Sequence, residues 1–375
     1  MAEPIRILHV IGIMNRGGAE IMIMNLYRNI DRTRVQFDFV ENSPEPAAFD
    51  QEILSLGGRI FRCPHYNGKN HFAYRKWWNS FFEVHQEEYA AVHGHLGSTA
   101  AIYLSIAARY GIYTIAHSHN VNMMRSVGDA VYALFAYPTR FVADTFFACS
   151  RDAGISRYGK LIGNDPRRCT VLRNAIDTTR FAFSMDARKA ARKKLGLTET
   201  QIVLGNISRF SDQKNHTFLL DIFAEVHKKE PGSVLLLVGD GALRPRIEQK
   251  IAQLGLMDAV ILTGVQRNTW DYYQAMDVFV MPSHYEGLGV ALVEAQTAGL
   301  PCCVSSAVPE ESALTSLVQF RSLADTAEQW ASWVLERTGL PRQDMRDAVR
   351  DAGYDISSTS RWLEDFYTKV VEDRG

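Results

Sequence analysis

Two glycines follow the first apolar run of the chain and could bring backbone amides to an anion. Gly17 and Gly18 lie in the stretch 12–20, which comes directly after the apolar residues 5–12. Without side chains, their backbone can approach a ligand closely. A helix predicted from Ala19 would add free N–H groups and the positive end of its dipole. The stretch has neither a complete dinucleotide fingerprint nor a phosphate-loop lysine, so a turn that only packs this helix remains an alternative.

A second loop offers two cations. Arg209 and Lys214 lie five residues apart in the stretch 206–215, which follows the apolar run 202–208. A guanidinium fork and an ammonium point charge together suit a diphosphate. The alternative is a pair of exposed basic side chains with no ligand.

A third loop offers two carboxylates. Glu286 and Glu294 are eight residues apart in the stretch 283–301, and Gly287 and Gly289 lie between them. If the helix begins near Glu286, the two carboxylates stand about 12 Å apart along its axis, which approximates the separation of ribose and sugar in a nucleotide diphosphate sugar. The glycines leave backbone N–H groups open for phosphate or sugar oxygens. The alternative is a dipole partner at the helix start and an ordinary helix residue.

Histidines end two of the apolar runs. His117 and His119 occur in the stretch 113–122, and strand alternation places both on one face; residues 93–95 read His-Gly-His. A metal site would need further ligands, and the chain contains neither H-E-x-x-H nor Asp-x-Asp. We therefore favour a single positioned histidine, His119, because it lies closer to the loop. The two histidines in 93–95 are interpreted as residues that line the binding site or support those that do.

Short apolar runs alternate with longer amphipathic stretches along most of the chain. Near-continuous apolar runs are typical of strands in a parallel sheet, and stretches such as 19–30 and 97–110 are long enough for crossover helices. The pattern restarts at residue 202 after a polar, charged break at 176–200, which we read as a linker. Two Rossmann-like α/β domains are predicted. All the polar loops above follow strands, where doubly wound sheets bind ligands.

Composition limits the class of protein. The chain has 375 residues, 46% hydrophobic and 22% charged, with a net charge of −1. These values fit two soluble domains and give no electrostatic case for nucleic acid. Five cysteines without a C-x-x-C motif favour a reducing compartment over a disulfide framework. The most apolar long segment, 130–149, is broken by Pro138, Arg140 and Asp144, so no bilayer span is expected. We expect a cytoplasmic protein, with peripheral membrane association left open.

The ordered motifs resemble glycosyltransferase family 4, in particular its bacterial capsule and exopolysaccharide branch. The resemblance covers about residues 5–320 and rests on the stretches 17–20, 117–120, 147–150, 171–177, 208–215, 235–244, 260–268 and 278–301. It implies a GT-B fold, in which two Rossmann-like α/β domains face a central cleft. The implied domains are an acceptor-binding domain (1–180), a nucleotide-sugar-binding domain (181–360) and a C-terminal helix that crosses back to the first (361–375).

The resemblance also implies a reaction. It is the metal-independent transfer of a sugar, with retention, from a nucleotide diphosphate sugar to a saccharide or polyprenyl-linked saccharide. UDP is the commonest nucleotide in this branch. The donor is a substrate, and neither a cofactor nor a metal is implied. The implied catalytic residues are His119, near the transferred sugar, and Glu286, on the donor sugar's hydroxyls.

The remaining implied contacts are to the rest of the donor. Arg209 and Lys214 would bind the diphosphate, and Glu294 the ribose hydroxyls. The implied backbone contacts are to the base at Gly264 and Val265, to sugar and phosphate at Gly287, Leu288, Gly289 and Val290, and to diphosphate or acceptor at Gly17 and Gly18.

Two other functions stay open at this stage. A GT-B nucleotide-sugar epimerase would turn over the donor without an acceptor, and a non-catalytic nucleotide-sugar-binding protein would bind it without turnover. The presence of Arg209, Lys214, Glu286 and Glu294 together argues against the non-catalytic alternative.

Overall fold

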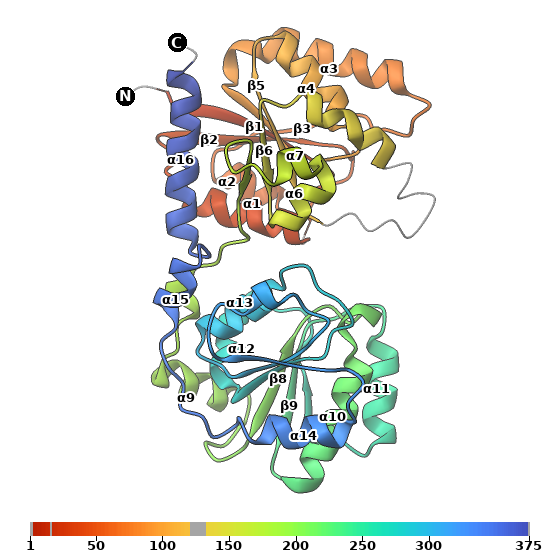
Figure 1. Cartoon of the computed structure of the whole chain (residues 1–375), viewed down its shortest axis with the longest axis vertical. Helices are drawn as coiled ribbons and strands as arrows, with labels where there is room; N and C mark the ends of the chain where they lie inside the picture. The colour runs from red at the N-terminus through yellow and green to blue at the C-terminus, as the bar shows by residue number, and fades with distance from the viewer. Residues whose placement is uncertain (1–2, 16, 121–132, 374–375) are drawn as a thin grey trace. The chain divides into compact units, whose positions relative to one another are not determined.

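The computed structural model describes residues 3–15, 17–120 and 133–373. Arg16 of the glycine stretch, the last two residues of the stretch 113–122 and the first three of the segment 130–149 lie outside this range. The chain forms two compact units, Met1–Ala175 with Ile356–Gly375 (unit 1) and Ile176–Asp355 (unit 2). In Figure 1, unit 1 runs from red to yellow-green and adds the last blue helix, and unit 2 contains the intervening green to blue segments.

Unit 1 contains a seven-stranded sheet with the order β3-β2-β1-β4-β5-β6-β7. Every neighbouring pair is parallel. Its strands are β1 (Ile5–Ile11), β2 (Val35–Glu41), β3 (Ile60–Arg62), β4 (Ala91–Gly94), β5 (Tyr113–Ser118), β6 (Thr145–Ala148) and β7 (Cys169–Val171). The order reverses beside β1, so the carboxyl ends of β1 and β4 lie at the switch point where doubly wound sheets bind ligands.

Helices cover both faces of this sheet. They are α1 (Gly18–Asn29), α2 (Asp50–Ser55), α3 (His71–His85), α4 (Ala100–Arg109), α6 (Arg151–Tyr158), α7 (Lys160–Gly163) and α16 (Ile356–Glu372), with 3-10 turns η1 (Gln86–Glu88) and η2 (Tyr137–Phe141). Side chains of α1 and α16 share one core with Ile7 and Ile115. Those of α3 and α4 share another with Leu8. Alternate strand residues therefore fill opposite cores, as the strand period of two requires.

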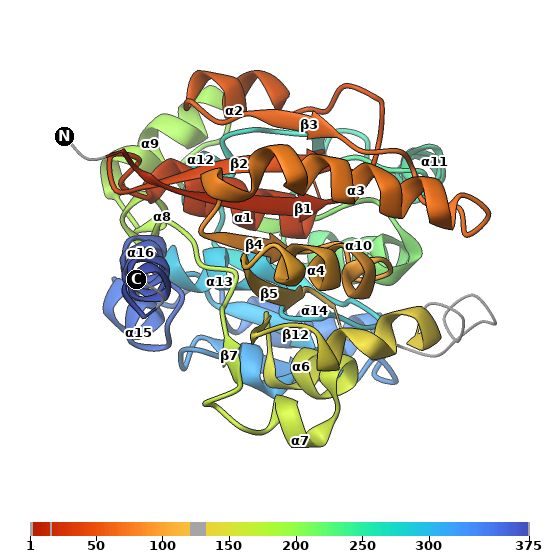
Figure 2. The ribbon, with the colours of Figure 1, turned by 90° about the horizontal axis from the view of Figure 1, so that it is seen from above.

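Helix α16 is part of unit 1 although it is the last element of the chain. It packs against α1, and its Leu363 and Tyr367 are fully buried in the core that contains Ile7. Figure 2 shows α16 end-on. The sequence also predicts helix over residues 344–372, but the structure interrupts it. Helix α15 (Arg346–Asp351) precedes Gly353, whose φ of 84° ends the helix, because a residue with a side chain avoids that conformation.

Unit 2 contains a six-stranded sheet with the order β10-β9-β8-β11-β12-β13, again parallel throughout. Its strands are β8 (Val203–Ile207), β9 (Val234–Val238), β10 (Val260–Leu262), β11 (Val278–Met281), β12 (Cys302–Ser305) and β13 (Val318–Arg321). The first five in chain order lie within apolar runs that the sequence predicts as strands, at 202–208, 233–241, 259–265, 278–283 and 301–306. Strand β13 was not predicted, because this short edge strand alternates buried Val318 with an exposed glutamine.

The helices of unit 2 also cover both faces of their sheet. They are α8 (Thr178–Phe181), α9 (Met185–Lys194), α10 (His216–Lys229), α11 (Arg244–Gln253), α12 (Thr269–Ala275), α13 (Val290–Thr297), α14 (Ala327–Leu335) and α15, with 3-10 turns η3 (Asp212–Lys214) and η4 (Glu310–Ser312). Helix α9 corrects the reading of 176–200 as a linker. Arg188 and Arg192 of α9 both form ion pairs with Asp277, the residue before β11. The charged side chains that suggest a linker therefore hold α9 against the start of β11.

Candidate active site

The glycine turn after β1 leads directly into α1. Gly17 is the N-terminal cap and Gly18 the first helical residue, one position earlier than predicted. A side chain on Gly17 would collide with the Glu20 carboxylate, which lies over the turn. Burial raises the pKa of Glu20. The predicted anion site is thus the start of a helix, and the Glu20 carboxylate from the first turn of that helix lies beside it. Sequence reasoning did not single out Glu20.

The two ligand loops of unit 2 are joined by side chains. Lys214, in η3 after β8, donates from Nζ to Oε1 of Glu286 at 2.6 Å. Gln213 Nε2 donates to the other carboxylate oxygen at 3.4 Å, and its carbonyl accepts from the backbone N–H of His284 at 2.8 Å. The Glu286 side chain is only 4% exposed. A buried carboxylate must be paired, so this arrangement fixes the cation and the carboxylate at the ends of neighbouring strands β8 and β11.

Arg209 differs from Lys214 although both belong to the same loop. Its side chain is exposed. No hydrogen bond or ion pair of its guanidinium is found within residues 3–15, 17–120 and 133–373. The structure therefore leaves its five donors available to a ligand.

The helix after β11 begins later than predicted. Residues 284–289 are not helical, and α13 starts at Val290 after Gly289, whose φ is 67°. The separation of about 12 Å predicted along a continuous helix is therefore wrong, because part of the interval from Glu286 to Glu294 is loop. Gly287 and Leu288 belong to this loop, and the first N–H groups of α13 are those that a helix leaves without intrahelical acceptors.

Glu294 lies on α13 and is held by a tyrosine that sequence reasoning missed. The hydroxyl of Tyr273, from α12, donates to Oε2 of Glu294 at 2.8 Å and contacts the Ala291 carbonyl at 3.1 Å. Tyr273 is fully buried. Burial raises the pKa of Glu294 to about 7, and the Tyr273 hydrogen bond opposes that shift. This carboxylate therefore titrates near neutral pH.

The predicted base contact lies after β10. Gly264 has a φ of 69° and its carbonyl accepts from the N–H of Gly239 at 2.9 Å. Val265 is 62% exposed, which is unusual for valine. An exposed apolar residue next to a fixed backbone turn can pack against a flat ring.

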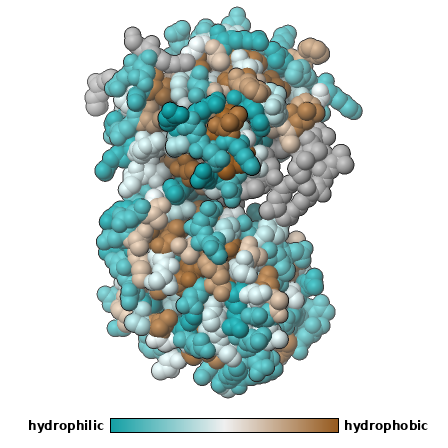
Figure 3. Space-filling view, in the orientation of Figure 1, coloured by the Kyte–Doolittle hydropathy of each residue, from teal (hydrophilic) through white to brown (hydrophobic). Residues whose placement is uncertain are grey.

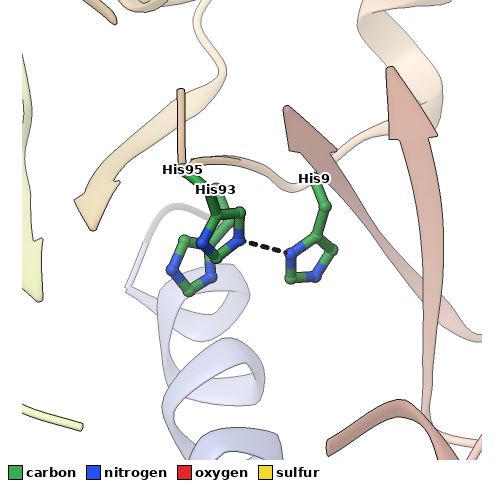
Figure 4. Close-up of side chains that lie close together, drawn as sticks. All are labelled: His9, His93 and His95. Atoms are coloured by element: carbon green, nitrogen blue, oxygen red, sulfur yellow. Dashed lines mark hydrogen bonds between the residues drawn. The ribbon is translucent and has the colours of Figure 1, made fainter. Parts of the chain in front are cut away.

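Five histidines cluster toward the carboxyl end of the unit 1 sheet: the four predicted at strand ends and, in addition, His9. His9 comes from β1, His93 and His95 from the end of β4, and His117 and His119 from the end of β5. The strand register pairs His9 with His93 and His93 with Ile115, and alternation then places His95, His117 and His119 on the same face, which α1 and α16 cover. Figure 4 shows His9, His93 and His95 with the bond between His9 and His95. The period-two pattern of these residues with β1 could have signalled His9.

The five rings form two hydrogen-bonded rows. In one row, His9 Nδ1 lies 2.9 Å from His95 Nε2, and His95 Nδ1 lies 2.8 Å from His119 Nε2. In the other, the Tyr367 hydroxyl of α16 lies 2.7 Å from His93 Nδ1, and His93 Nε2 lies 3.1 Å from His117 Nδ1. The rows stack: the ring centroids are 4.4 Å apart for His93 and His95, and 4.1 Å for His117 and His119.

Burial keeps these rings neutral. It lowers the pKa of His9 to about 3 and that of His119 to about 4. The pKa values of His93, His95 and His117 fall well below the usual value, through burial first and then through neighbouring imidazoles. Neutral imidazoles bind metals, and two sets of three ligand atoms lie within 4.8 Å of one another, His9–His93–His95 and His95–His117–His119.

Ring orientation argues against one ion bound by either set. A metal lies in the plane of each imidazole that ligates it, in line with the nitrogen lone pair. The stacked rings of His93 and His95 differ in plane by only 22°, and those of His117 and His119 by 27°. Nearly parallel planes meet far from the ring nitrogens, so ligation by a whole set would require a ring to rotate out of its stack.

The fold and these loops define the class of the protein. The solved Anabaena protein Alr3699/HepE, in complex with UDP, superposes with a TM-score of 0.77 at 18% identity, covering 97% of this chain and all of that one. WaaG, a glycosyltransferase involved in lipopolysaccharide biosynthesis, gives 0.72 at 17% identity, covering 96% and 99%. The fold is that of the GT-B class.

Sequence comparison gives the family. Residues 16–180 match the family model described as Glycosyltransferase Family 4, and residues 187–319 match Glycosyl transferases group 1. EpsF of Bacillus subtilis (strain 168), whose name describes it as a glycosyltransferase, is 36% identical over 98% of this chain and 97% of its own length. The chain belongs to glycosyltransferase family 4. This membership favours the transferase over the epimerase and the non-catalytic binding protein.

A more distant relative carries a fully described reaction. It is the UDP-Gal:alpha-D-GlcNAc-diphosphoundecaprenol alpha-1,3-galactosyltransferase of Escherichia coli, 27% identical over 59% of each chain.

Proposed function

We propose that this protein transfers a sugar from a UDP-sugar, with retention and without a metal, to a saccharide or lipid-linked saccharide in bacterial surface polysaccharide synthesis. The observation that carries the proposal is the pairing of Lys214 with Glu286. It brings a cation and a carboxylate to the carboxyl ends of β8 and β11, and the loop after β8 also carries Arg209, which has no partner among the described residues. That set can bind a diphosphate and a polyol in one site.

The donor would be divided among the loops of unit 2. Arg209 and Lys214 bind the diphosphate, and the N–H groups at Leu288 to Val290 add neutral donors. Glu286 accepts from the sugar hydroxyls and Glu294 from those of the ribose. The exposed Val265 beside Gly264 meets the base. Lys214 donates one of its three N–H groups to Glu286, so two remain for phosphate oxygens.

Bond cleavage places negative charge on the departing diphosphate. Preorganised cations and amides stabilise such charge, and each lost donor costs about 10²–10³ in rate. Arg209, Lys214 and the α13 amides therefore take the part that a divalent ion takes in other transferases. The acceptor hydroxyl attacks from the face that the diphosphate leaves, which retains the anomeric configuration.

Two side chains contribute at the transferred sugar. Glu286 binds hydroxyls and is not a covalent nucleophile, since its carboxylate is already shared between Lys214 and Gln213. His119 of unit 1 offers a neutral ring nitrogen, because burial holds its pKa at about 4. A neutral ring hydrogen-bonds a sugar hydroxyl without adding charge near the developing oxocarbenium ion.

The relatives support the donor and acceptor classes. The E. coli relative is named for UDP-galactose and a diphosphoundecaprenol-linked acceptor. HepE was solved with UDP-glucose. EpsF matches nearly the whole chain.

A lipid-linked acceptor calls for contact with a membrane surface. Across the described parts of the chain, no helix has the length and apolarity to cross a bilayer. Unit 1 exposes Phe135, Tyr137 and Phe141 around η2, and the Arg140 guanidinium lies 4.0 Å from the centre of the Tyr137 ring. Figure 3 shows apolar residues as separate patches on a largely hydrophilic face. We propose that aromatic and cationic groups of this kind hold the protein peripherally on anionic lipid.

The test is transfer in EDTA from a panel of UDP-, GDP- and ADP-sugars to polyprenyl-diphosphate saccharides. NMR of the product's anomeric proton decides between retention and inversion. Arg209→Ala and Lys214→Ala should each lower kcat/KM by about 10²–10³, and Lys228→Ala, an exposed helix lysine, should not. Native rates in both site variants, strict dependence on a divalent ion, or an inverted product would each overturn the proposal.

A further inference from the structure

The histidine row His9–His95–His119 has a countable set of protons. Its rings join edge to edge: the His9 and His95 planes are 9° apart with centroids at 5.2 Å, whereas their nitrogens are only 2.9 Å apart. The two terminal nitrogens, Nε2 of His9 and Nδ1 of His119, are buried without a partner among the described residues. A neutral imidazole carries one N–H and one lone pair. Three neutral rings therefore carry three protons, and each of the two N–H···N bonds uses one.

The third proton must lie on one end of the row. If His9 donates to His95, then His95 donates to His119, and the remaining proton lies on Nδ1 of His119. If the bonds run the other way, that proton lies on Nε2 of His9, and Nδ1 of His119 is a lone pair. A mixed arrangement would leave His95 with two protons or none, which a neutral ring cannot have. The two ends therefore have opposite hydrogen-bonding character.

The second row has an anchor that fixes its direction. The Tyr367 hydroxyl is fully buried, and burial raises its pKa well above the usual value, so it keeps its proton. If it donates to Nδ1 of His93, then His93 donates to His117 and Nε2 of His117 carries the last proton. The reverse direction would leave the phenol proton buried without its acceptor, which is costly. Within the described parts of the chain, the first row has no hydroxyl of this kind at either end.

We propose that His9 and His95 are positioning residues that set the ring tautomer of His119, and that the row switches between two uncharged states which make Nδ1 of His119 a donor or an acceptor. This coupling rests on the ring geometry and on the neutrality that burial imposes on the rings. Its use in catalysis rests on the proposed function, in which His119 meets a sugar hydroxyl. A sugar hydroxyl can both donate and accept a hydrogen bond. A His119 ring that can also donate or accept, without gaining charge, can stay hydrogen-bonded to it while the bond between sugar and diphosphate breaks.

The test reads tautomers directly and needs no substrate. The eleven histidines are labelled with ¹⁵N, and NMR distinguishes protonated from unprotonated ring nitrogens. His9→Phe keeps an aromatic ring on the stack but removes the first N–H···N bond, and we expect the His119 nitrogen shifts to change. His93→Phe is the matched control, since it keeps the stacking and breaks only the other row. It should change His117 and leave His119 as in the native protein.

Further variants keep the test decisive. Tyr367→Phe should alter the shifts of His93 and His117 but not those of His119. If His9→Phe does not fold, His95→Gln takes its place. Kinetically, His9→Phe should lower kcat for transfer by about five- to tenfold, the worth of one misplaced hydrogen bond, with KM for the donor unchanged. Unaltered His119 shifts in His9→Phe, or equal changes in His9→Phe and His93→Phe, would overturn the relay. Zinc or nickel bound stoichiometrically in the native protein, with metal-bound ring shifts, would also overturn it. If the shifts behave as expected but no donor is turned over, the relay stands and the proposed function fails.

Discussion

Lys214 and Glu286 are 2.6 Å apart between Nζ and Oε1, and this ion pair joins the loop after β8 to the loop after β11. The family resemblance assigns the two residues to different parts of the donor, the diphosphate and the sugar. Because they are paired, each residue affects the charge of the other. In the free enzyme the Glu286 carboxylate neutralises the Lys214 ammonium. A bound diphosphate must share that ammonium with Glu286. Substitution of either residue therefore changes two interactions.

Glu286→Gln separates these effects. The amide keeps the shape and a hydroxyl acceptor but removes the charge that neutralises Lys214. We expect free UDP to bind several-fold more tightly, because Lys214 then faces only the diphosphate, whereas kcat falls by about 10²-fold through the loss of a charged acceptor on the sugar. Calorimetry of UDP binding and initial rates measure the two quantities.

Lys214→Ala is the paired control for that experiment. It should weaken UDP binding and lower kcat together, since it removes the cation and leaves Glu286 a buried carboxylate with its charge uncompensated. If Glu286→Gln weakened UDP binding as much as Lys214→Ala does, the carboxylate would be part of the diphosphate site and not its competitor.

Tyr273→Phe should shift the pH dependence of donor binding. The Tyr273 hydroxyl stabilises the ionised form of Glu294 and so lowers a pKa that burial has raised to about 7. Without it the pKa rises further. Ribose hydroxyls donate to the ionised form, so UDP binding should weaken as pH falls through that pKa, and the midpoint should move upward in the variant. Binding constants from pH 5.5 to 9 measure the midpoint.

The neighbouring tyrosine provides the control. Tyr272→Phe removes a hydroxyl from the same helix without touching Glu294, and its midpoint should equal that of the native protein. An unchanged midpoint in Tyr273→Phe would mean that Glu294 does not hold the ribose.

Arg209 and Arg192 should behave in opposite ways. Arg209 is exposed with no partner among the described residues, so Arg209→Ala should lower kcat/KM by about 10²–10³ and leave the melting temperature unchanged. The Arg192 side chain is fully buried and pairs with Asp277. Arg192→Ala should cost about 3–5 kcal/mol of stability, the usual result of breaking a buried pair. Calorimetric unfolding and initial rates of the two variants, measured together, distinguish a ligand arginine from a structural one.

The sequence predicted the helices and strands well where a short run of residues alternated apolar and polar with a two-residue period or was apolar throughout. It failed where the backbone departs from a regular helix, as between Glu286 and Val290, because Gly289 takes a left-handed conformation that spacing cannot show. It also missed partners that come from distant segments. Tyr273 reaches Glu294 from another helix, and Tyr367 reaches His93 across 274 residues.

The linker prediction failed for a related reason. Residues 185–194 are rich in lysine and arginine, which indicates a solvated segment when charge alone is considered. In the folded unit, Arg192 of this segment is buried and donates to four backbone carbonyls besides Asp277. Composition predicts the charge of a segment but not which acceptors the fold will place around it.

The histidine rows should make unit 1 sensitive to acid. In the unfolded chain these imidazoles have their ordinary pKa of about 6.5, whereas burial lowers the pKa of His9 to about 3 and of His119 to about 4 in the folded protein. At pH 8 the rings are neutral in both states. As pH falls below about 6.5 the unfolded chain binds protons that the folded unit does not, so stability is lost between about pH 6.5 and the folded pKa values.

Each ring that is neutral when folded and protonated when unfolded costs about 1.4 kcal/mol per pH unit. Hydrogen exchange of the amides of β1, β4 and β5 at pH 7.5, 6.5 and 5.5, corrected for intrinsic exchange, measures this loss within unit 1. His93→Phe removes one titrating ring and keeps the stack, so the slope of stability against pH below 6.5 should become shallower by about one proton. The same slope in both proteins, or constant protection over this range, would show that the rings are already protonated when folded and that the neutral rows do not exist.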